Sequence, residues 1–313
     1  MKLIETTSES ELARQAPVTV VVVSDYETAG PKSWANERAA LRALGQQDFP
    51  EPFEVIVAEH EAFRNSEPAD LLSQCRGARI EYCAATTSAA LKDEGARRAR
   101  GALVAILEAD CTPVREWLRH LVSALRERSE YAAVSGKTLY PGQSLFVRCL
   151  TLLDRSGLDP GGSGPVSGIC NNNSMFRRTI LAQYPYPPAP SPFLSAALRW
   201  RAMHADNLRC FFESRAVVYH ALPSWSFVKD MRRHSGYSLS AQVEGNLSRI
   251  VQAFARQLYY DLRRCWRLRH HYSVAAYEIP FTLALAVVAR FYEFAGVRDM
   301  RRGRVGVPRT SYR

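Results

Sequence analysis

A short apolar run that ends in two acidic residues is the feature that most constrains this chain. Residues 102–107 are continuously apolar, which is typical of a strand buried on both faces of a parallel sheet. The carboxyl end of such a strand opens into the crevice where ligands bind in open α/β sheets. Glu108 and Asp110 follow at that end, and carboxylates placed there can hold a hard divalent cation that also binds phosphates.

Asp110 could instead serve only the helix that follows it. Thr112 and Pro113 have the residue types of an N-cap and a first helical position, and they predict a helix over residues 114–128. In that alternative the two acids hold no ligand. The rest of the sequence has to decide between the two interpretations.

The first two thirds of the chain alternate predicted strands with predicted helices. The strands cover residues 18–23, 53–58, 78–83, 102–107, 130–140 and 216–219, and the helices residues 34–44, 88–100, 114–128 and 193–204. This order predicts the α/β class, with βαβ units in a mostly parallel sheet flanked by helices. Polar residues follow several strands at the same edge of that sheet: Ser24, Asp25, Tyr26, Glu59 and His220.

Composition indicates a folded protein with reduced cysteines. The chain has 313 residues, 47% of them apolar, which is enough for a full core. Residues 1–16 form a polar tail without the apolar segment of a signal peptide, so a cytoplasmic protein is expected. The seven cysteines form no C-x-x-C pair, and their odd number argues against a disulfide framework.

The net charge of +10 is concentrated in the carboxyl third. Residues 199–313 hold 20 Lys and Arg against 8 Asp and Glu, whereas residues 1–198 hold 21 against 23. Such asymmetry predicts an anionic partner, either nucleic acid or a membrane surface. Nucleic acid is not the expected partner, because no recognised binding motif occurs in this region.

Residues 224–313 are predicted to form basic amphipathic helices. Arg249, Arg256 and Arg263 recur every seven residues in a helix over residues 247–272. Its apolar face carries Leu247, Ile250, Val251, Phe254, Leu258 and Leu262. The next apolar run, residues 279–289, is shorter than the ~18–20 residues that span a bilayer. We expect peripheral attachment to an anionic membrane surface, with a packed subdomain or a dimer interface as the alternative.

Taken in order, the predicted segments resemble the family 2 glycosyltransferases of the GT-A fold over roughly residues 17–223. The similar segments are residues 18–27, 54–59 (Glu-Val-Ile-Val-Ala-Glu), 91–101, 107–113 (Leu-Glu-Ala-Asp-Cys-Thr-Pro), 173–178 (Asn-Ser-Met-Phe-Arg-Arg) and 216–220. The resemblance implies a GT-A domain that moves a sugar from a nucleotide diphosphate to an acceptor hydroxyl. Residues 224–313 would be its helical, basic extension.

The resemblance also implies roles for the residues at the sheet edge. Asp110 would hold Mn²⁺ or Mg²⁺ across the donor diphosphate, and His220 would complete the metal site unless it is purely structural. Glu108 would bind the ribose. The other residues implied in nucleotide-sugar binding are Ser24, Asp25, Tyr26, Glu59 and Lys92. Lys92 has the alternative of a solvated helix face. Asn172 and Asn173 would lie on the acceptor side, or would serve only a turn.

The chain departs from the family at the general base. The family places Glu-Asp just before a helix that ends in Trp-x-Arg, and alignment on this helix puts Leu194 and Ser195 at those positions. Neither residue can remove a proton near neutral pH. The nearby candidates are Asp206, His204 and Glu213, each of which can equally be an ordinary surface or helix-end residue.

These features together predict a metal-dependent, inverting glycosyltransferase. Its donor would be a nucleotide diphosphate sugar, and its acceptor a lipid-linked or membrane-proximal glycan at the cytoplasmic face of a membrane. The missing base leaves a second hypothesis, a catalytically silent protein that binds a nucleotide sugar or acts as a scaffold on the same fold.

Overall fold

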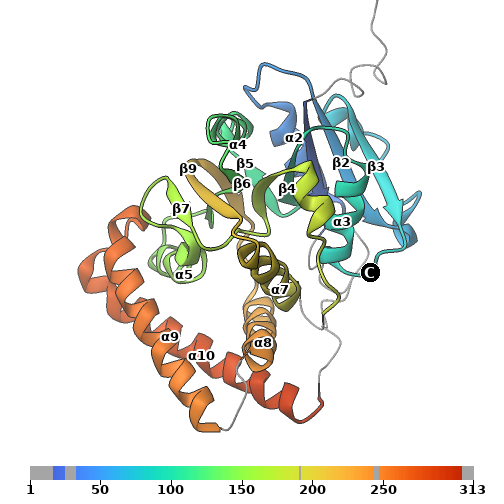
Figure 1. Cartoon of the computed structure of the whole chain (residues 1–313). Coiled ribbons are helices and arrows are strands. Elements are labelled where there is room, and N and C mark those ends of the chain that lie inside the picture. Colours follow the sequence, from blue (N-terminus) through green and yellow to red (C-terminus); the bar gives the residue numbers. More distant parts are fainter. Residues whose placement is uncertain (1–16, 25–32, 190–191, 243–246, 305–313) are drawn as a thin grey trace, which may run out of the picture.

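The computed structural model describes residues 17–24, 33–189, 192–242 and 247–304, and its centre is one mixed sheet (Figure 1). The strand order is β3-β2-β1-β4-β8-β6-β9-β5, and β7 pairs with β9. The strands are β1 (Val18–Val23), β2 (Phe53–His60), β3 (Ala78–Cys83), β4 (Leu103–Glu108), β5 (Cys111–Pro113), β6 (Tyr131–Leu139), β7 (Gly164–Val166), β8 (Asn173–Arg177) and β9 (Arg209–His220).

The first half of the sheet, β3-β2-β1-β4, is parallel as expected. All six residues of β1 are buried, because neighbouring strands and helices cover both its edges and both its faces. The register pairs Val23 of β1 with Ala58 of β2 and with Glu108 of β4. The carboxyl ends of these strands are therefore level, so Ser24, Glu59 and Glu108 lie along one edge.

The second half of the sheet contains antiparallel pairs that the sequence pattern did not predict. β8 runs antiparallel between β4 and β6, and β5 pairs antiparallel with the end of β9. The prediction of Thr112 as a helix N-cap is wrong, because Thr112 is extended and pairs with Tyr219. The helix that follows begins at Trp117 instead.

Helices cover both faces of the sheet. The helices outside the carboxyl-terminal region are α2 (Ala35–Gly45), α3 (Ser88–Arg98), α4 (Trp117–Arg126), α5 (Leu145–Arg155), α6 (Arg178–Gln183) and α7 (Pro192–Ala205), and short 3₁₀ turns include η3 (Ser156–Leu158). On one face, α2 and α4 share a core with Val20 and Val22 of β1. On the other, α3, α6 and α7 share a core with Val21 and Val23. This division follows from the alternation of side chains along a strand.

Three long helices form the carboxyl-terminal region: α8 (Trp225–Gln242), α9 (Leu247–Leu268) and α10 (Ile279–Arg301). Figure 1 shows them together at one end of the molecule, with α5 and α7 between them and the sheet. Neither α5 nor α8 was predicted from the sequence. Ion pairs that are largely buried connect α5, α8, α9 and α10, and they join Asp154, Arg232, Glu293, Arg290 and Asp261.

The apolar face predicted for α9 is mainly used inside the protein. Ile250 is buried, Leu258 packs against the core that α5, α9 and α10 share, and Phe254 contacts Phe294 of α10 at 5.9 Å between ring centroids. Arg256 and Arg263, in contrast, are exposed. The side chain of Leu247 lies outside the described residues.

Among the described residues, one helical segment, Ala276–Arg301, is long and apolar enough to cross a membrane by length and composition alone. This indication is weak, because a core helix of a water-soluble protein passes the same test. Arg290 and Glu293 of this segment are buried or nearly so in the ion pairs with α8 and α9. One face of α10 is therefore a packing surface.

The crossing of α8 and α10 requires two glycines. A Cβ on Gly236 would lie 2.1 Å from the carbonyl oxygen of Glu293, and one on Gly296 would lie 2.1 Å from that of Arg233. Both contacts involve backbone, which cannot turn aside as a side chain can. We predict that Gly296→Ala lowers the free energy of unfolding by about 1–3 kcal/mol. Urea denaturation followed by circular dichroism measures this change.

Gly162→Ala is the matched control for Gly296→Ala, because a Cβ on Gly162 would meet no heavy atom within 4 Å. Its unfolding midpoint should equal that of the original chain. Equal midpoints for both variants would contradict the close crossing of α8 and α10.

A half-buried acid on α3 gives stability a specific pH dependence. Burial raises the pKa of Asp93 to about 6, and its carboxyl group accepts a hydrogen bond of 2.8 Å from the backbone N–H of Tyr186. The folded state thus binds this proton more tightly than the unfolded state, and the resulting stability is lost as the pH rises through about 6. Asn at this position stays neutral and keeps an acceptor oxygen.

We predict that Asp93→Asn becomes more stable relative to the original chain as the pH rises from 4 to 7, by about 1 kcal/mol or more. Thermal and urea denaturation at each pH measure the difference. Asp70→Asn should show almost no trend in this range, because the hydrogen bond from Arg38 lowers the pKa of Asp70 and its contribution changes only at lower pH. A constant difference for Asp93→Asn would contradict the raised pKa.

Candidate functional site

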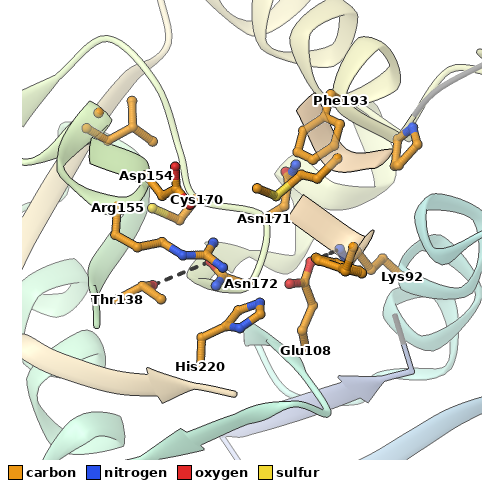
Figure 2. A pocket seen from close by; sticks show the side chains of 15 residues that line it. Lys92, Glu108, Thr138, Asp154, Arg155, Cys170, Asn171, Asn172, Phe193 and His220 are labelled. Carbon is orange, nitrogen blue, oxygen red and sulfur yellow. Dashed lines mark hydrogen bonds and ion pairs between the residues drawn. The ribbon is translucent and has the colours of Figure 1, made fainter. Parts of the chain in front are cut away.

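A pocket of about 250 Å³ opens beside the carboxyl edge of the sheet (Figure 2). Its wall combines strand ends, the carboxyl end of α5, the loop before β8, and residues from the start of α7 and from α8. The lining residues are Lys92, Glu108, Thr138, Asp154, Arg155, Gly157, Leu158, Cys170, Asn171, Asn172, Pro192, Phe193, His220, Phe227 and Met231. The pocket therefore combines charged groups with an apolar wall, as ligand sites commonly do.

The pairing of β5 with β9 brings Asp110 and His220 together. Cys111 is directly opposite His220 in this pairing, and the Asp110 carbonyl accepts a hydrogen bond from the Ala221 N–H at 2.8 Å. As a result, Oδ2 of Asp110 lies 3.2 Å from Nε2 of His220. These two side chains were the metal ligands predicted from the sequence.

The hydrogen bonds of His220 determine what can lie between the two groups. Its Nδ1 lies 2.7 Å from the Ala221 carbonyl oxygen, which can only accept, so Nδ1 carries a proton. Burial lowers the pKa of His220 and raises that of Asp110. Nε2 of a neutral ring with this tautomer is an acceptor that faces another acceptor. A proton or a metal ion between them removes the repulsion.

The donor set around Asp110 fits a divalent cation. One ligand atom each from Glu108, Asp110, Cys111 and His220 lies within 4.8 Å of the others. Carboxylate oxygens with an imidazole nitrogen suit Mn²⁺ and also Mg²⁺. Cys111 is the least suitable ligand, because burial raises the pKa of its thiol well above the ordinary value and a neutral thiol is a poor ligand.

Glu108 is oriented by Lys92 of α3. Nζ of Lys92 donates to Oε1 of Glu108 at 2.6 Å, and both side chains are almost fully buried. Lys92 thus lies on the inner face of its helix, and the solvated alternative is wrong. The pair fixes one oxygen of Glu108 and neutralises its charge.

The predicted nucleotide end of the site contains a cluster of acids around a serine. The Ser24 hydroxyl is in contact with Oε2 of Glu59 at 2.6 Å and with a carboxylate oxygen of Glu37. Glu59 is fully buried and also accepts a 2.7 Å hydrogen bond from the His60 N–H. The predicted residues Asp25 and Tyr26 lie outside the described residues.

The neighbouring asparagines Asn172 and Asn173 have different environments. Asn172 lines the pocket, where its amide contacts Thr138 at 3.5 Å and the Cys111 sulfur at 3.6 Å. Asn173 is fully buried in β8. Its amide bonds to the Trp117 indole and to two backbone carbonyls. The structure therefore contradicts an acceptor-side role for Asn173, because its side-chain hydrogen bonds hold α4 and β9 to the sheet.

None of the three candidate bases lies in the pocket. His204 and Asp206 are exposed at the end of α7, where Asp206 accepts a hydrogen bond from the Tyr184 hydroxyl at 2.5 Å. Glu213 is buried on β9 and is bound by Ser163 and Arg215. The sequence placed them near the site only because they follow the expected base position in the chain. These three assignments are corrected accordingly.

The position that the family uses for its base is structural in this chain. Leu194 is buried on α7, and the Ser195 hydroxyl donates to the Pro187 carbonyl at 2.6 Å. No carboxylate replaces them at this position.

Sequence reasoning missed Arg155 and Asp154 at the end of α5. Arg155 stacks over Tyr140, with 4.8 Å from its guanidinium carbon to the ring centroid. Asp154 pairs with Arg232 and accepts from the Tyr140 hydroxyl at 3.3 Å. The signal was available, because Ser144 is an N-cap before a run with apolar residues at helical spacing.

Comparison with known proteins agrees with this geometry. A family model described as glycosyl transferase family 2 matches residues 32–184. Among solved structures, the chain is similar to a mannosyltransferase, PcManGT from Pyrobaculum calidifontis, in complex with GDP-Man and Mn²⁺. That similarity has a TM-score of 0.56 and 15% identity over 91% of this chain and 87% of the other. A search of curated proteins gives no match.

The matched family region includes Lys92, Glu108 and Asn172 of the pocket, and Asp110 of the cluster beside it. At 15% identity, the likeness to the solved structure shows the fold. Together the two findings support glycosyl transfer from a nucleotide sugar. The chain therefore carries a family 2 glycosyltransferase domain of the GT-A fold.

Proposed function

We propose that the protein is a metal-dependent, inverting glycosyltransferase whose cation, Mn²⁺ or Mg²⁺, is held by Asp110 and His220. The observation that carries this proposal is the 3.2 Å approach of Oδ2 of Asp110 to Nε2 of His220 beside the pocket. Ionised Asp110 and neutral His220 are both acceptors, so a cation between them would be bound by both groups. The Mn²⁺ of the similar solved structure supports the same reading.

The residues around the cation have separable roles in the proposed reaction. A bound divalent cation would neutralise the charge that develops on the departing diphosphate. Glu108, fixed by Lys92 at 2.6 Å, would accept hydrogen bonds from the ribose. Asn172 offers an amide to the sugar or the acceptor. Phe193 and Phe227 would exclude water from the reacting atoms.

The metal assignment is tested with nucleotides. We predict that Asp110→Asn weakens Mn²⁺-dependent binding of GDP or UDP by about tenfold or more, while the fold is preserved because no core volume is removed. Isothermal titration calorimetry with and without Mn²⁺ measures the affinity. His220→Gln should act in the same direction.

Asp70→Asn is the control for Asp110→Asn, since it removes an exposed carboxylate that pairs with Arg38. It should leave nucleotide affinity unchanged. If folded Asp110→Asn protein keeps its Mn²⁺-dependent affinity, Asp110 is not a metal ligand.

The silent-scaffold hypothesis rests on the missing base at Leu194 and Ser195. It predicts that the protein binds a nucleotide with Mn²⁺ but never transfers or hydrolyses a sugar from any donor. Turnover of one nucleotide sugar would exclude it.

We further propose that the carboxyl-terminal helices attach the protein to an anionic membrane surface. Tyr277, in the turn just before α10, is 84% exposed, and α10 continues an exposed stripe of large apolar side chains, of which Phe291 is 68% exposed. The other members of this stripe are Phe281, Val287, Val288 and Phe294. On α9, exposed arginines lie near the exposed aromatic residues Tyr259, Tyr260 and Trp266. Apolar and aromatic groups beside cations suit a lipid headgroup region.

The membrane proposal is tested by sedimentation with liposomes. Full-length protein should bind anionic vesicles more strongly than neutral ones, and less strongly as salt rises. Two triple variants should each reduce vesicle binding. One changes Phe281, Val288 and Phe291 to Ser, and the other changes Arg249, Arg256 and Arg263 to Gln. Nucleotide affinity should not change.

Leu72→Ser is the control for the apolar triple variant, because Leu72 is exposed to the same degree as Phe281, 37%, on the opposite part of the chain. The membrane proposal would be overturned if the protein did not sediment with anionic vesicles at low salt. It would also be overturned if the purified protein were a dimer whose interface buries α10.

A further inference from the structure

None of the ionisable groups that line the pocket is suited to remove a proton from an acceptor hydroxyl. Glu108 is bound by Lys92, and Asp154 by Arg232 and Tyr140. His220 faces Asp110. Burial raises the pKa of the Cys170 thiol to about 11, which leaves it neutral. Together with Leu194 and Ser195 at the usual base position, this indicates an acceptor that needs no base.

Arg155 is a cation in the same pocket, and the carboxylates of Glu108 and Asp110 act on it electrostatically although neither forms an ion pair with it. Among the described residues it has no hydrogen bond or ion pair, and its Nε is buried without a hydrogen-bond partner. Its guanidinium stacks over the Tyr140 ring. The side chain as a whole is partly exposed and lines the pocket, so an anion that enters the pocket can reach its guanidinium. Its planar fork fits two oxygens of a phosphate.

The position of Arg155 distinguishes the acceptor end of the pocket from the nucleotide end. Figure 2 shows Arg155 and Thr138 on one side of His220, and Lys92 and Glu108 on the other. The strand order places Glu108 of β4 toward Ser24 and Glu59, and Thr138 of β6 away from them. An anion on Arg155 would therefore lie beyond the metal position from the nucleotide.

The wall next to Arg155 is apolar. Leu158 follows it in η3, and Phe227 and Met231 of α8 and Phe193 of α7 complete this side. An anionic headgroup on an apolar chain matches such a wall better than a fully hydroxylated sugar does.

We propose that the acceptor of this enzyme is a phosphomonoester, bound through its phosphate by Arg155. This inference rests on the proposed glycosyl transfer and names its acceptor class. A phosphomonoester has a second pKa of about 6, so it is mostly a dianion at neutral pH. Its oxygen attacks without losing a proton, and no general base is needed.

The proposed step is balanced in bonds and charge. A bond forms between a phosphate oxygen of the acceptor and the anomeric carbon of the donor sugar. The bond from that carbon to the nucleoside diphosphate breaks, and the leaving oxygen keeps the electron pair. The products are a glycosyl phosphodiester and a nucleoside diphosphate.

The test measures binding of decyl phosphate, glycerol 3-phosphate and decanol to the full chain by calorimetry. Decyl phosphate should bind and decanol should not. Arg155→Gln should weaken phosphate binding about 10- to 100-fold, and Arg155→Lys, which keeps the charge, should weaken it less. Arg126→Gln, which changes an exposed arginine paired with Glu51, should have no effect. If glycerol 3-phosphate binds more tightly than decyl phosphate, the acceptor is a water-soluble phosphomonoester and not a lipid phosphate.

A second series with GDP or UDP and Mn²⁺ separates this proposal from the donor function. Unchanged nucleotide affinity in Arg155→Gln, with phosphate binding lost, supports the acceptor assignment. Equal phosphate affinity in both proteins, or a loss of nucleotide affinity instead, overturns it. If the original chain binds decyl phosphate but no nucleotide with Mn²⁺, the donor function is wrong. If it binds nucleotide but no phosphomonoester, only the acceptor proposal is wrong.

Discussion

The antiparallel pairing of β5 with the end of β9 is the constraint on which the site depends. Three residues of β5 bring a loop that follows β4 against a strand that ends more than 100 residues later in the chain. This pairing brings Oδ2 of Asp110 to within 3.2 Å of Nε2 of His220. Without it, Asp110 would be an acid on a turn, and the edge of the sheet would offer single carboxylates in place of a cluster.

The parts of the fold set by continuous local patterns could be predicted from the sequence. β1, β2 and β4 are mainly apolar or β-branched runs, β3 alternates charged and apolar residues at its start, and their order predicted level carboxyl ends. β5 and β8 could not be found in this way, because their partners are distant in the chain. Asn172 and Asn173 differ because Asn173 is the first residue of β8, inside the sheet, whereas Asn172 lies in the preceding loop at the pocket. α5 was overlooked, and Arg155 with it.

The basic carboxyl third shows why net charge is an incomplete guide to a surface. Arg232 and Arg290 belong to this excess, yet they are largely buried in ion pairs with Asp154, Glu293 and Asp261. Buried pairs of this kind contribute little net stability compared with apolar packing, and removal of one partner is costly. The buried ion pairs determine how the helices pack, and the exposed arginines of α9 are the ones that can contact a partner.

The pocket has a consequence for how the chain can be divided. Phe227 and Met231 of α8 line it together with residues of the sheet domain, and Asp154, next to Arg155, is held by Arg232 of α8. A truncation after residue 223 would open one wall and leave the Asp154 charge uncompensated. The helices that follow the sheet domain are thus a structural part of the pocket, and a shortened chain would lose its shape there before losing its strands.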